Sequence, residues 1–325
     1  MTQTPPIPAE WSPHKALWLG FPSHAELWQD DLPQAQAEVA ALARTLAGVG
    51  REHVKLVVMG PGAEAAAHKL LAGTDNITIL QAKFGDIWLR DTGPIFTTTE
   101  AHCFEFNGWG GKYQLEHDDS IGAWMAHQAG QVPLCHDVIL EGGALDHNGE
   151  GVILTTRQCL LNPNRNPGIT EAQWEGLLAS TLGARRVVWL DDGLVNDHTD
   201  GHVDNLARFV GPGRVAVPAA SGDDDPHAAV YAAAQSRLRD AGFEVIEIPS
   251  PGRIEVDGEI VPASHMNFII ANGAVIMPTY EDTYAPQALE VLEATFPDRA
   301  VMGLPSLAIL TGGGSFHCIT QQEPA

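Results

Sequence analysis

The chain has 325 residues, and its 41 acidic and 18 basic residues give a formal net charge of −23. This charge argues against nucleic acid as a partner and against an anionic membrane surface, because both require clustered lysine and arginine. It permits a cationic ligand, although a surplus of acids also serves solubility alone.

The N-terminus, MTQTPPIPAEW, has neither the basic nor the apolar segment of a secretion signal, and no apolar run in the chain is as long as a membrane span. We therefore expect a cytoplasmic protein with free thiols. None of the four cysteines belongs to a CxxC pair, so a structural zinc site is not expected.

Amphipathic and β-rich segments alternate after a proline-rich arm at residues 1–13. Apolar residues at helical spacing predict helices at 31–48, 62–72, 119–129, 170–182, 226–241 and 286–295. β-rich runs predict strands at 55–59, 77–81, 94–99, 152–156, 186–190, 214–218, 244–248, 267–271 and 274–279. Asn148-Gly149 and Asn272-Gly273 predict hairpin turns. No linker divides the chain, and the later helices begin about 50–60 residues apart, which suggests one α/β domain at 14–325 with a repeated unit.

Five segments combine glycine with aspartate, glutamate, histidine or tryptophan, and glycine lets a backbone approach a ligand closely. They are WLRDTGP (88–94), NGWGGK (107–112), EGG (141–143), DHTDGHVDN (197–205) and GGGSFHCITQQ (312–322). If the HVDN segment is a strand, His202 and Asp204 project from the same face, which would place an acid/base group beside a carboxylate. The alternative is a pair of surface residues at a strand end.

Cys318 follows three glycines, where a thiol can meet a ligand and be activated by a nearby base or cation. The alternative is a buried, inert thiol. Asp91 could accept two hydrogen bonds from a guanidinium group, and Trp88 could cover its alkyl stem, although DTGP is also good turn chemistry. Glu141 is either a third pocket carboxylate or a loop residue, and we expect Trp109 in the core.

A cysteine, a histidine and three acids indicate attack by a thiolate on an electrophilic carbon. A peptidase or amidase needs one acid to orient the histidine and an oxyanion hole. A guanidine hydrolase needs more carboxylates, because the cation must be held before it is attacked. The surplus of acids favours the guanidine hydrolase.

These motifs, in this order, resemble the agmatine deiminase and bacterial-type peptidylarginine deiminase family. The matching segments run from about Pro8 to Gln322, nearly the whole chain: PAEW (8–11), WLRDTGP, FNGWGGK (106–112), EGG, LNPNRNP (161–167), DGHVDN (200–205), NFIIANG (267–273) and HCITQQ (317–322). The resemblance implies the pentein fold, a five-bladed α/β-propeller of ββαβ-type units with the active site in a central channel.

The resemblance also implies residue roles and no metal or organic cofactor. Cys318 would be the nucleophile and His202 the general base and acid. Asp91 and Asp204 would hold the guanidinium nitrogens, and Glu141 would orient His202.

The resemblance makes Trp88 a pocket wall, and the sequence departs from the family pattern at two places. Ser315 and Phe316 stand where the family often has Asn-Ile, and Asp200-Gly201 precedes His202 where Asn-Glu is often found. We expect Asp200 or Asp197 to supply the negative charge for a distal ammonium group.

The implied substrate is a small guanidine cation, and agmatine, which would give N-carbamoylputrescine and ammonia, is the first choice. Arginine residues in peptides are the alternative, and a non-catalytic binding protein on the same fold is a further one. Free arginine as substrate would require a basic residue to hold its α-carboxylate, and Arg90, Arg165 and Arg208 are candidates. The sequence leaves oligomeric state open.

Overall fold

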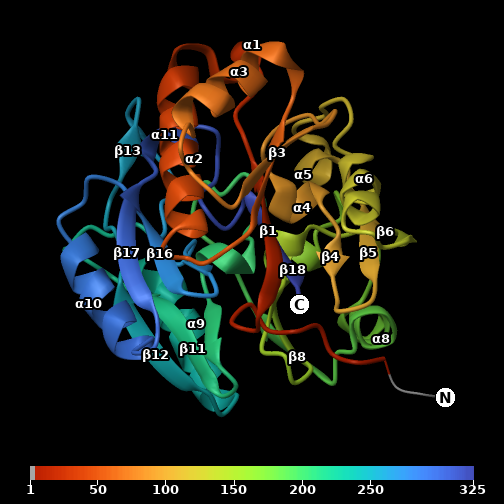
Figure 1. Cartoon of the computed structure of the whole chain (residues 1–325). Coiled ribbons are helices and arrows are strands. Elements are labelled where there is room, and N and C mark those ends of the chain that lie inside the picture. Colours follow the sequence, from red (N-terminus) through yellow and green to blue (C-terminus); the bar gives the residue numbers. More distant parts are fainter. Residues whose placement is uncertain (1–3) are drawn as a thin grey trace.

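Five small sheets form the framework of the computed structural model, which describes residues 4–325. In each sheet two strands are antiparallel, and a helix then leads to a further strand that is parallel to its neighbour. Figure 1 shows these units following one another around the molecule in chain order. The α/β class and the repeated unit suggested by the sequence are therefore present.

The two ends of the chain meet in the first sheet, whose strand order is β18-β1-β2-β3. Its strands are β1 (His14–Gly20), β2 (Val54–Val58), β3 (Ile77–Gln81) and β18 (Thr320–Pro324), and its helices are α2 (Leu32–Ala47) and α3 (Gly60–Leu70). β18 is antiparallel to β1, so the last strand of the chain completes the first unit. This pairing lies beside Cys318, which immediately precedes β18.

The other four sheets have three strands and one long crossover helix each. The second contains β4 (Ile95–Phe96), β5 (Ala101–Glu105), α6 (Ile121–Gln128) and β6 (Pro133–Ile139). The third contains β7 (Asp146–His147), β8 (Val152–Thr156), α8 (Glu171–Leu182) and β9 (Arg186–Leu190). The fourth contains β10 (Arg208–Gly211), β11 (Arg214–Ala219), α9 (Ala228–Asp240) and β12 (Glu244–Pro249). The fifth contains β15 (Ile269–Ile270), β16 (Ala274–Thr279), α10 (Ala285–Thr295) and β17 (Ala300–Pro305).

Short elements fill the connections between these units. The short helices are α1 (Ala25–Trp28), α4 (Leu89–Thr92), α5 (Gly108–Gly111), α7 (Arg157–Leu160) and α11 (Leu307–Leu310). The 3-10 turns are η1 (Gln29–Asp31), η2 (Gly142–Ala144) and η3 (Val203–Asn205). A two-stranded ribbon consists of β13 (Glu255–Val256) and β14 (Glu259–Ile260).

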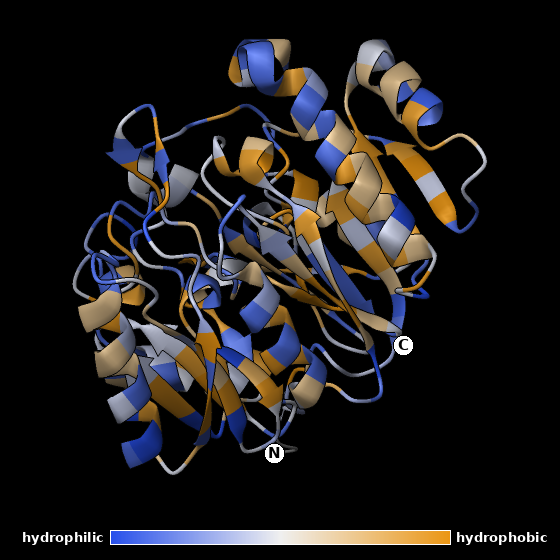
Figure 2. Ribbon diagram, turned by 90° about the vertical axis from the view of Figure 1, so that its left-hand side faces the viewer, coloured by the Kyte–Doolittle hydropathy of each residue, from blue (hydrophilic) through white to orange (hydrophobic). Residues whose placement is uncertain are grey.

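Each long helix packs an apolar side against its sheet. Helix α8 shows how the sequence sets such a helix: the Thr170 hydroxyl accepts the Gln173 backbone N–H, and the Gln173 side chain accepts the Thr170 N–H in return. Its buried residues are Trp174, Leu178 and Leu182. Figure 2 shows apolar residues concentrated on the strands and on the helix sides that face them. Within residues 4–325 no helix is both long enough and apolar enough to cross a membrane.

All six predicted helices are present, and both predicted hairpins are confirmed by the antiparallel pairs β7/β8 and β15/β16. The conditional prediction of a strand at His202-Val203-Asp204 is wrong, because Val203 and Asp204 lie in the 3-10 turn η3. The sequence pattern did not predict several strands: β1, β5, β6, β10, β17 and β18.

Residues of the proline-rich arm pack against the protein. Glu10 is buried, its carboxylate pairs with the guanidinium of Arg208, and it also accepts the backbone N–H of Ile270. Asp146 holds the other side of Arg208 at 2.6 Å. Because Arg208 is fully buried, the arm contributes one of the two acids that neutralise this cation.

Candidate active site

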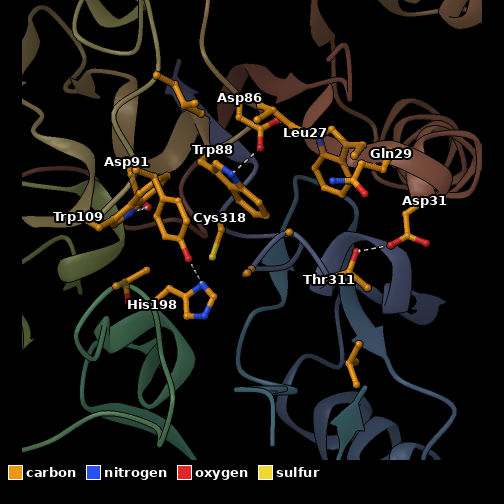
Figure 3. Close-up of a pocket in the computed structure, with 18 of the residues that line it drawn as sticks. Leu27, Gln29, Asp31, Asp86, Trp88, Asp91, Trp109, His198, Thr311 and Cys318 are labelled. Atoms are coloured by element: carbon orange, nitrogen blue, oxygen red, sulfur yellow. Dashed lines mark hydrogen bonds between the residues drawn. The ribbon is translucent and has the colours of Figure 1, made fainter. Parts of the chain in front are cut away.

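A cavity of about 620 Å³ opens among the connections between the units. Its lining includes three tryptophans, several acids and the sulfur-bearing residue Cys318. Figure 3 shows Trp88, Asp91, Trp109 and His198 arranged around the Cys318 thiol. The cavity therefore joins a flat aromatic wall, negative charge and a thiol.

Corresponding connections of the fold supply Asp91 and Cys318, which line this cavity, and the polar residues that are buried next to them. Asp91 lies in α4 before β4, and Glu141 lies between β6 and η2. His202 and Asp204 lie at η3 before β10, and Cys318 precedes β18. The repeated unit thus brings together residues that are up to 227 positions apart in the chain, as the Arg90 to His317 contact illustrates.

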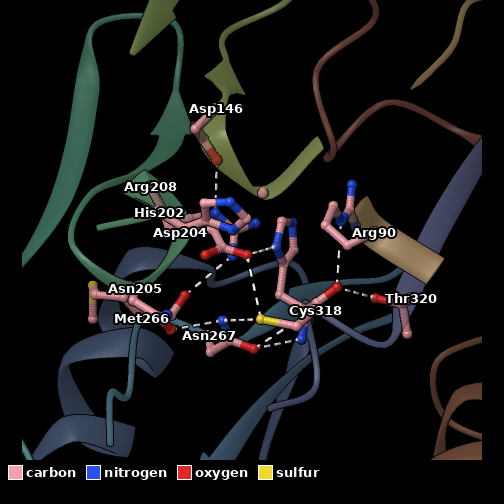
Figure 4. Close-up of polar contacts among 12 residues, drawn as sticks. Arg90, Asp146, His202, Asp204, Asn205, Arg208, Met266, Asn267, Cys318 and Thr320 are labelled. Carbon is pink, nitrogen blue, oxygen red and sulfur yellow. Dashed lines mark hydrogen bonds and ion pairs between the residues drawn. The ribbon is translucent and has the colours of Figure 1, made fainter. Parts of the chain in front are cut away.

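The Cys318 sulfur lies in a buried polar cluster at the cavity floor. Its Sγ is 3.7 Å from Asp204 Oδ2 and 3.2 Å from Asn267 Nδ2 (Figure 4). Burial raises the pKa of the Cys318 thiol well above its usual value, and the charges of Asp204 and Asp91 raise it further. The thiol is therefore protonated at neutral pH while the site is empty of cations.

Asp91 is positioned by two hydrogen bonds. Its Oδ1 accepts the Gly143 backbone N–H at 3.0 Å, and its Oδ2 accepts the Trp109 indole N–H at 3.0 Å. Burial raises the pKa of Asp91 to about 6, and the neighbouring Asp204 and Glu141 charges add to this although His202 opposes it. Trp109 is buried, as expected, and it also lines the cavity.

His202 is fully buried between two acids. Its Nδ1 lies 3.7 Å from Asp91 Oδ1, and its Nε2 lies 3.9 Å from Glu141 Oε2. Burial lowers the pKa of His202, but the charge of Asp91 and the contact with Glu141 raise it well above the usual value. His202 is therefore an imidazolium that can donate a proton.

Glu141 and Asp204 remain ionised because each has a cationic or hydrogen-bonding partner. Arg165 Nε donates to both Glu141 oxygens at 2.8 and 2.9 Å, and despite burial His202 and Arg165 lower the Glu141 pKa. His317 Nδ1 lies 2.7 Å from Asp204 Oδ2, and this contact lowers the Asp204 pKa despite burial. Within residues 4–325 the buried Asp204 Oδ1 has no hydrogen-bond partner, so it can accept one from a ligand.

Because Gly143 has no side chain, His202, Asp91 and Asp204 can lie close together around it. A β-carbon at position 143 would lie 2.6 Å from His202 Nδ1, 2.8 Å from Asp91 Oδ1 and 3.2 Å from Asp204 Oδ2. Gly314 has a similar place on the other side of the cavity, where a β-carbon would lie 2.6 Å from Trp88 Cζ3 and 3.2 Å from the Cys318 sulfur. Both positions require the absence of a side chain.

Trp88 forms part of the cavity wall, as the sequence predicted. It stacks near Trp28, with ring centroids 6.3 Å apart, and the carboxylate of Asp86 accepts both indole N–H groups at 2.9 Å. The two residues that differ from the family's glycine-turn pattern are both buried. Phe316 is fully buried, and the Ser315 hydroxyl makes a hydrogen bond of 2.7 Å with the Ser306 hydroxyl.

Asp197 and Asp200 do not line the cavity. Asp200 pairs with Arg165 at 2.7 Å and with Lys112 at 2.5 Å, so its charge is already neutralised. Asp197 is buried and accepts hydrogen bonds from Thr199. The acids that face the cavity nearer to solvent are Asp30, Asp31 and Asp257.

One group of side chains has donor atoms close enough for a metal to be considered. Atoms of Glu141, Cys159 and His202 lie within 4.8 Å of one another, and all three residues are buried. The Arg165 guanidinium already donates to both Glu141 oxygens and would repel a cation placed there. The arrangement therefore suits an ion pair with the imidazolium better than a metal.

The sequence analysis missed three residues that position the site: Arg165, Asn267 and His317. Each lies in a segment that carried the family resemblance, LNPNRNP, NFIIANG or HCITQQ. Their positions in buried turns gave no periodic signal. Cys159, which no sequence motif singled out, also lies buried beside His202.

Comparisons with known proteins give a consistent result over the whole chain. The sequence profile of the family described as Porphyromonas-type peptidyl-arginine deiminase matches residues 6–324. The agmatine deiminase of Stutzerimonas stutzeri is 34% identical over 358 residues, covering 98% of this chain and 95% of that protein.

Solved structures agree. The agmatine deiminase of Enterococcus faecalis superposes with a TM-score of 0.90 at 28% identity, covering 98% of this chain and 95% of that one. A substrate-bound agmatine deiminase of C. jejuni superposes with a TM-score of 0.89 at 27% identity, covering 100% and 98%.

Proposed function

The chain belongs to the Porphyromonas-type peptidyl-arginine deiminase family and has the pentein α/β-propeller fold, and on this basis we propose that it is an agmatine deiminase. It hydrolyses a C–N bond of the guanidinium group and releases N-carbamoylputrescine and ammonia. Several similar relatives and solved structures carry the name agmatine deiminase, and one of those structures has substrate bound.

The observation that supports the proposal is that Cys318 and Asp91 line an aromatic, acidic cavity, with the buried Asp204 Oδ2 3.7 Å from the Cys318 sulfur. A guanidinium group is flat and positively charged, and it pairs well with carboxylates. Trp88 can cover the alkyl chain, and the acids nearer to solvent, Asp30 and Asp257, can attract a distal ammonium group.

The cavity also distinguishes agmatine from arginine. Among the described residues that line it there is no lysine or arginine, so the α-carboxylate of free arginine would meet acids without a basic partner. Arg165 and Arg208, which were candidates for that role, are occupied by Glu141, Asp200, Glu10 and Asp146.

In the first half of the proposed reaction, Asp91 and Asp204 hold the substrate cation against the thiol. The cation lowers the pKa of Cys318, the thiol releases its proton to solvent, and the resulting thiolate adds to the guanidinium carbon. His202 donates a proton to the departing nitrogen, the C–N bond breaks, and ammonia leaves behind a covalent thiouronium.

In the second half, His202, now neutral, removes a proton from water. The resulting hydroxide adds to the thiouronium carbon, the C–S bond breaks, and the added hydroxyl gives its proton to solvent. The neutral ureido group then leaves with Cys318 again a thiolate. Glu141 keeps His202 oriented, and its contact favours the imidazolium form in each cycle. No metal or organic cofactor takes part in these steps, and we place the reaction in the cytoplasm on the sequence grounds given above.

The test is turnover of agmatine, free arginine and a blocked arginyl peptide, with ureido product and ammonia measured for wild type and Cys318→Ala. We expect the highest kcat/KM with agmatine and no turnover by the variant. Preference for the peptide would favour the peptidylarginine alternative. Inactivity of the folded wild-type protein on all three would favour a binding protein and refute the proposal.

A further inference from the structure

Asn267 occupies the fifth of the corresponding connections, between β14 and β15. The other four connections supply Asp91, Glu141, the pair His202 and Asp204, and Cys318. Asn267 is fully buried, and its side-chain nitrogen lies 3.2 Å from the Cys318 sulfur (Figure 4). The repeated fold therefore presents a fifth polar residue directly to the reacting atom.

The hydrogen-bond network fixes which end of the Asn267 amide faces the sulfur. Its Oδ1 accepts the backbone N–H groups of His317 at 2.8 Å and Cys318 at 3.3 Å. Its Nδ2 donates to Asn205 Oδ1 at 2.8 Å. Because a backbone N–H can only donate, the oxygen must face the turn, and the NH₂ group must face Cys318.

A hydrogen-bond donor at this position would stabilise the Cys318 thiolate. Burial and the charges of Asp204 and Asp91 oppose the Cys318 thiolate, whereas the Asn267 N–H and a hydrogen bond from the Ser315 backbone favour it. The sulfur must carry negative charge twice in the proposed reaction, as the attacking nucleophile and as the leaving group when the C–S bond breaks. A fixed N–H stabilises both forms, and it needs no rearrangement because the Asn267 amide is already held by its other hydrogen bonds.

We propose that Asn267 is a catalytic residue that stabilises the Cys318 thiolate through an Nδ2–H···Sγ hydrogen bond, an inference that rests on the proposed deiminase reaction for its role in turnover. Asn205 acts as the positioning residue, because it holds the second hydrogen of the same NH₂ group.

The test measures thiolate formation apart from turnover. Cys318 is alkylated with iodoacetamide at a fixed pH below its thiol pKa, without substrate. Its peptide is followed by mass spectrometry because the reagent also reaches Cys135, which is exposed. Asn267→Asp keeps the side-chain shape and removes the N–H donor. Asn267→Ser removes the N–H donor without adding charge, and its shorter side chain ends one bond short of the position of Nδ2. Loss of the N–H lowers the thiolate fraction but raises the intrinsic reactivity of the thiolate, so we expect alkylation to slow by about threefold for each unit of pKa increase.

Asn166→Asp is the matched control. Asn166 also holds backbone with both ends of its amide, at Ile139 N and Ile139 O, but it does not contact Cys318. We expect this variant to retain the wild-type alkylation rate, and thermal melts establish that each variant is folded. With agmatine, both Asn267 variants should lose kcat while KM changes little.

The outcomes separate this inference from the proposed function. Slower alkylation in both Asn267 variants supports the hydrogen bond even if the wild-type protein turns over no guanidine, in which case only the reaction is wrong. Slower alkylation in Asn267→Asp alone would assign the effect to the new charge and overturn the inference. Wild-type alkylation in Asn267→Ser with reduced kcat would show a structural role, and it would overturn the inference as well. If Asn267→Asp does not fold, Asn267→Ser decides.

Discussion

Asp91 should make agmatine binding depend on pH in a range where most carboxylates no longer titrate. Burial raises the pKa of Asp91 to about 6, whereas an ordinary aspartate ionises near 3.8. The guanidinium cation is attracted only by the ionised form. Because this pKa is raised, the charge is complete well above pH 6 and is lost as the pH falls through that value.

The size of the effect follows from the ionised fraction. With a pKa of about 6, roughly ten-elevenths of Asp91 is ionised at pH 7 and roughly one-eleventh at pH 5. The apparent Kd for agmatine should therefore be about tenfold weaker at pH 5 than at pH 7, or about 1.4 kcal/mol in binding free energy. At pH 5 binding should also release nearly one proton, since the cation favours the ionised carboxylate.

Isothermal titration of Cys318→Ala measures this without turnover, and buffers of different ionisation enthalpy report the released proton. Asp118→Asn provides the control: burial raises the pKa of Asp118 to about 7, but this carboxylate holds the backbone N–H of Gly85 and does not line the cavity. The control should keep the full pH dependence, and Asp91→Asn should bind weakly at every pH. An unchanged Kd from pH 5 to 7, or a dependence that disappears with Asp118→Asn, would refute the reasoning.

Two further substitutions test the geometry. Gly143→Ala places a methyl group 2.6 Å from His202 Nδ1 and 2.8 Å from Asp91 Oδ1, so we expect kcat for agmatine to fall by about 100-fold with the fold retained, as checked by steady-state kinetics and circular dichroism. An unchanged kcat would mean that these groups need not converge. Glu10→Ala leaves the buried Arg208 with Asp146 as its single acidic partner, and urea denaturation should show a loss of about 3 kcal/mol in unfolding free energy. A loss below about 1 kcal/mol would mean that the Glu10–Arg208 pair stabilises the protein no more than an exposed salt bridge does.

The sequence predicted the long helices well because amphipathic spacing extends over three or four turns in each of them. Helix α8 carries its own start signal in the capping box at Thr170. The strands that the pattern missed are short or placed by distant partners. β18, for example, consists of TQQEP, which has no apolar alternation, and it becomes a strand because β1 lies beside it.

The site residues that could be predicted are those whose own motif contains both a reactive side chain and neighbouring glycines or acids. Cys318, His202, Asp91, Asp204 and Glu141 lie in segments whose glycines and acids already indicated a site, and in the structure these residues lie together. How they divide the catalytic work stays a prediction.

Asn267 was missed because NFIIANG reads as a buried strand and turn, with two side-chain amides and no titratable group. Its role becomes apparent only in the structure, where the connection before β15 brings the Asn267 amide next to the Cys318 sulfur. The expectation that Asp200 supplies charge for a distal ammonium group could not take its partners into account. Nothing in DGHVDN indicates that Arg165 and Lys112 pair with the Asp200 carboxylate.

The surplus of acids around Cys318 has a consequence for selectivity. Asp91 and Asp204 raise the thiol pKa in the free enzyme, so the sulfur is protonated and slow to react with electrophiles or oxidants. The same two carboxylates attract a guanidinium cation, which offsets their charge and removes the Coulombic part of that pKa increase. A neutral molecule of similar shape would fill the cavity without releasing the thiolate. Under the proposed roles of Asp91, Asp204 and Cys318, the substrate's guanidinium charge serves both for binding and for activating the thiol. The site therefore discriminates at both steps against a neutral ureido group, including the one on its own product.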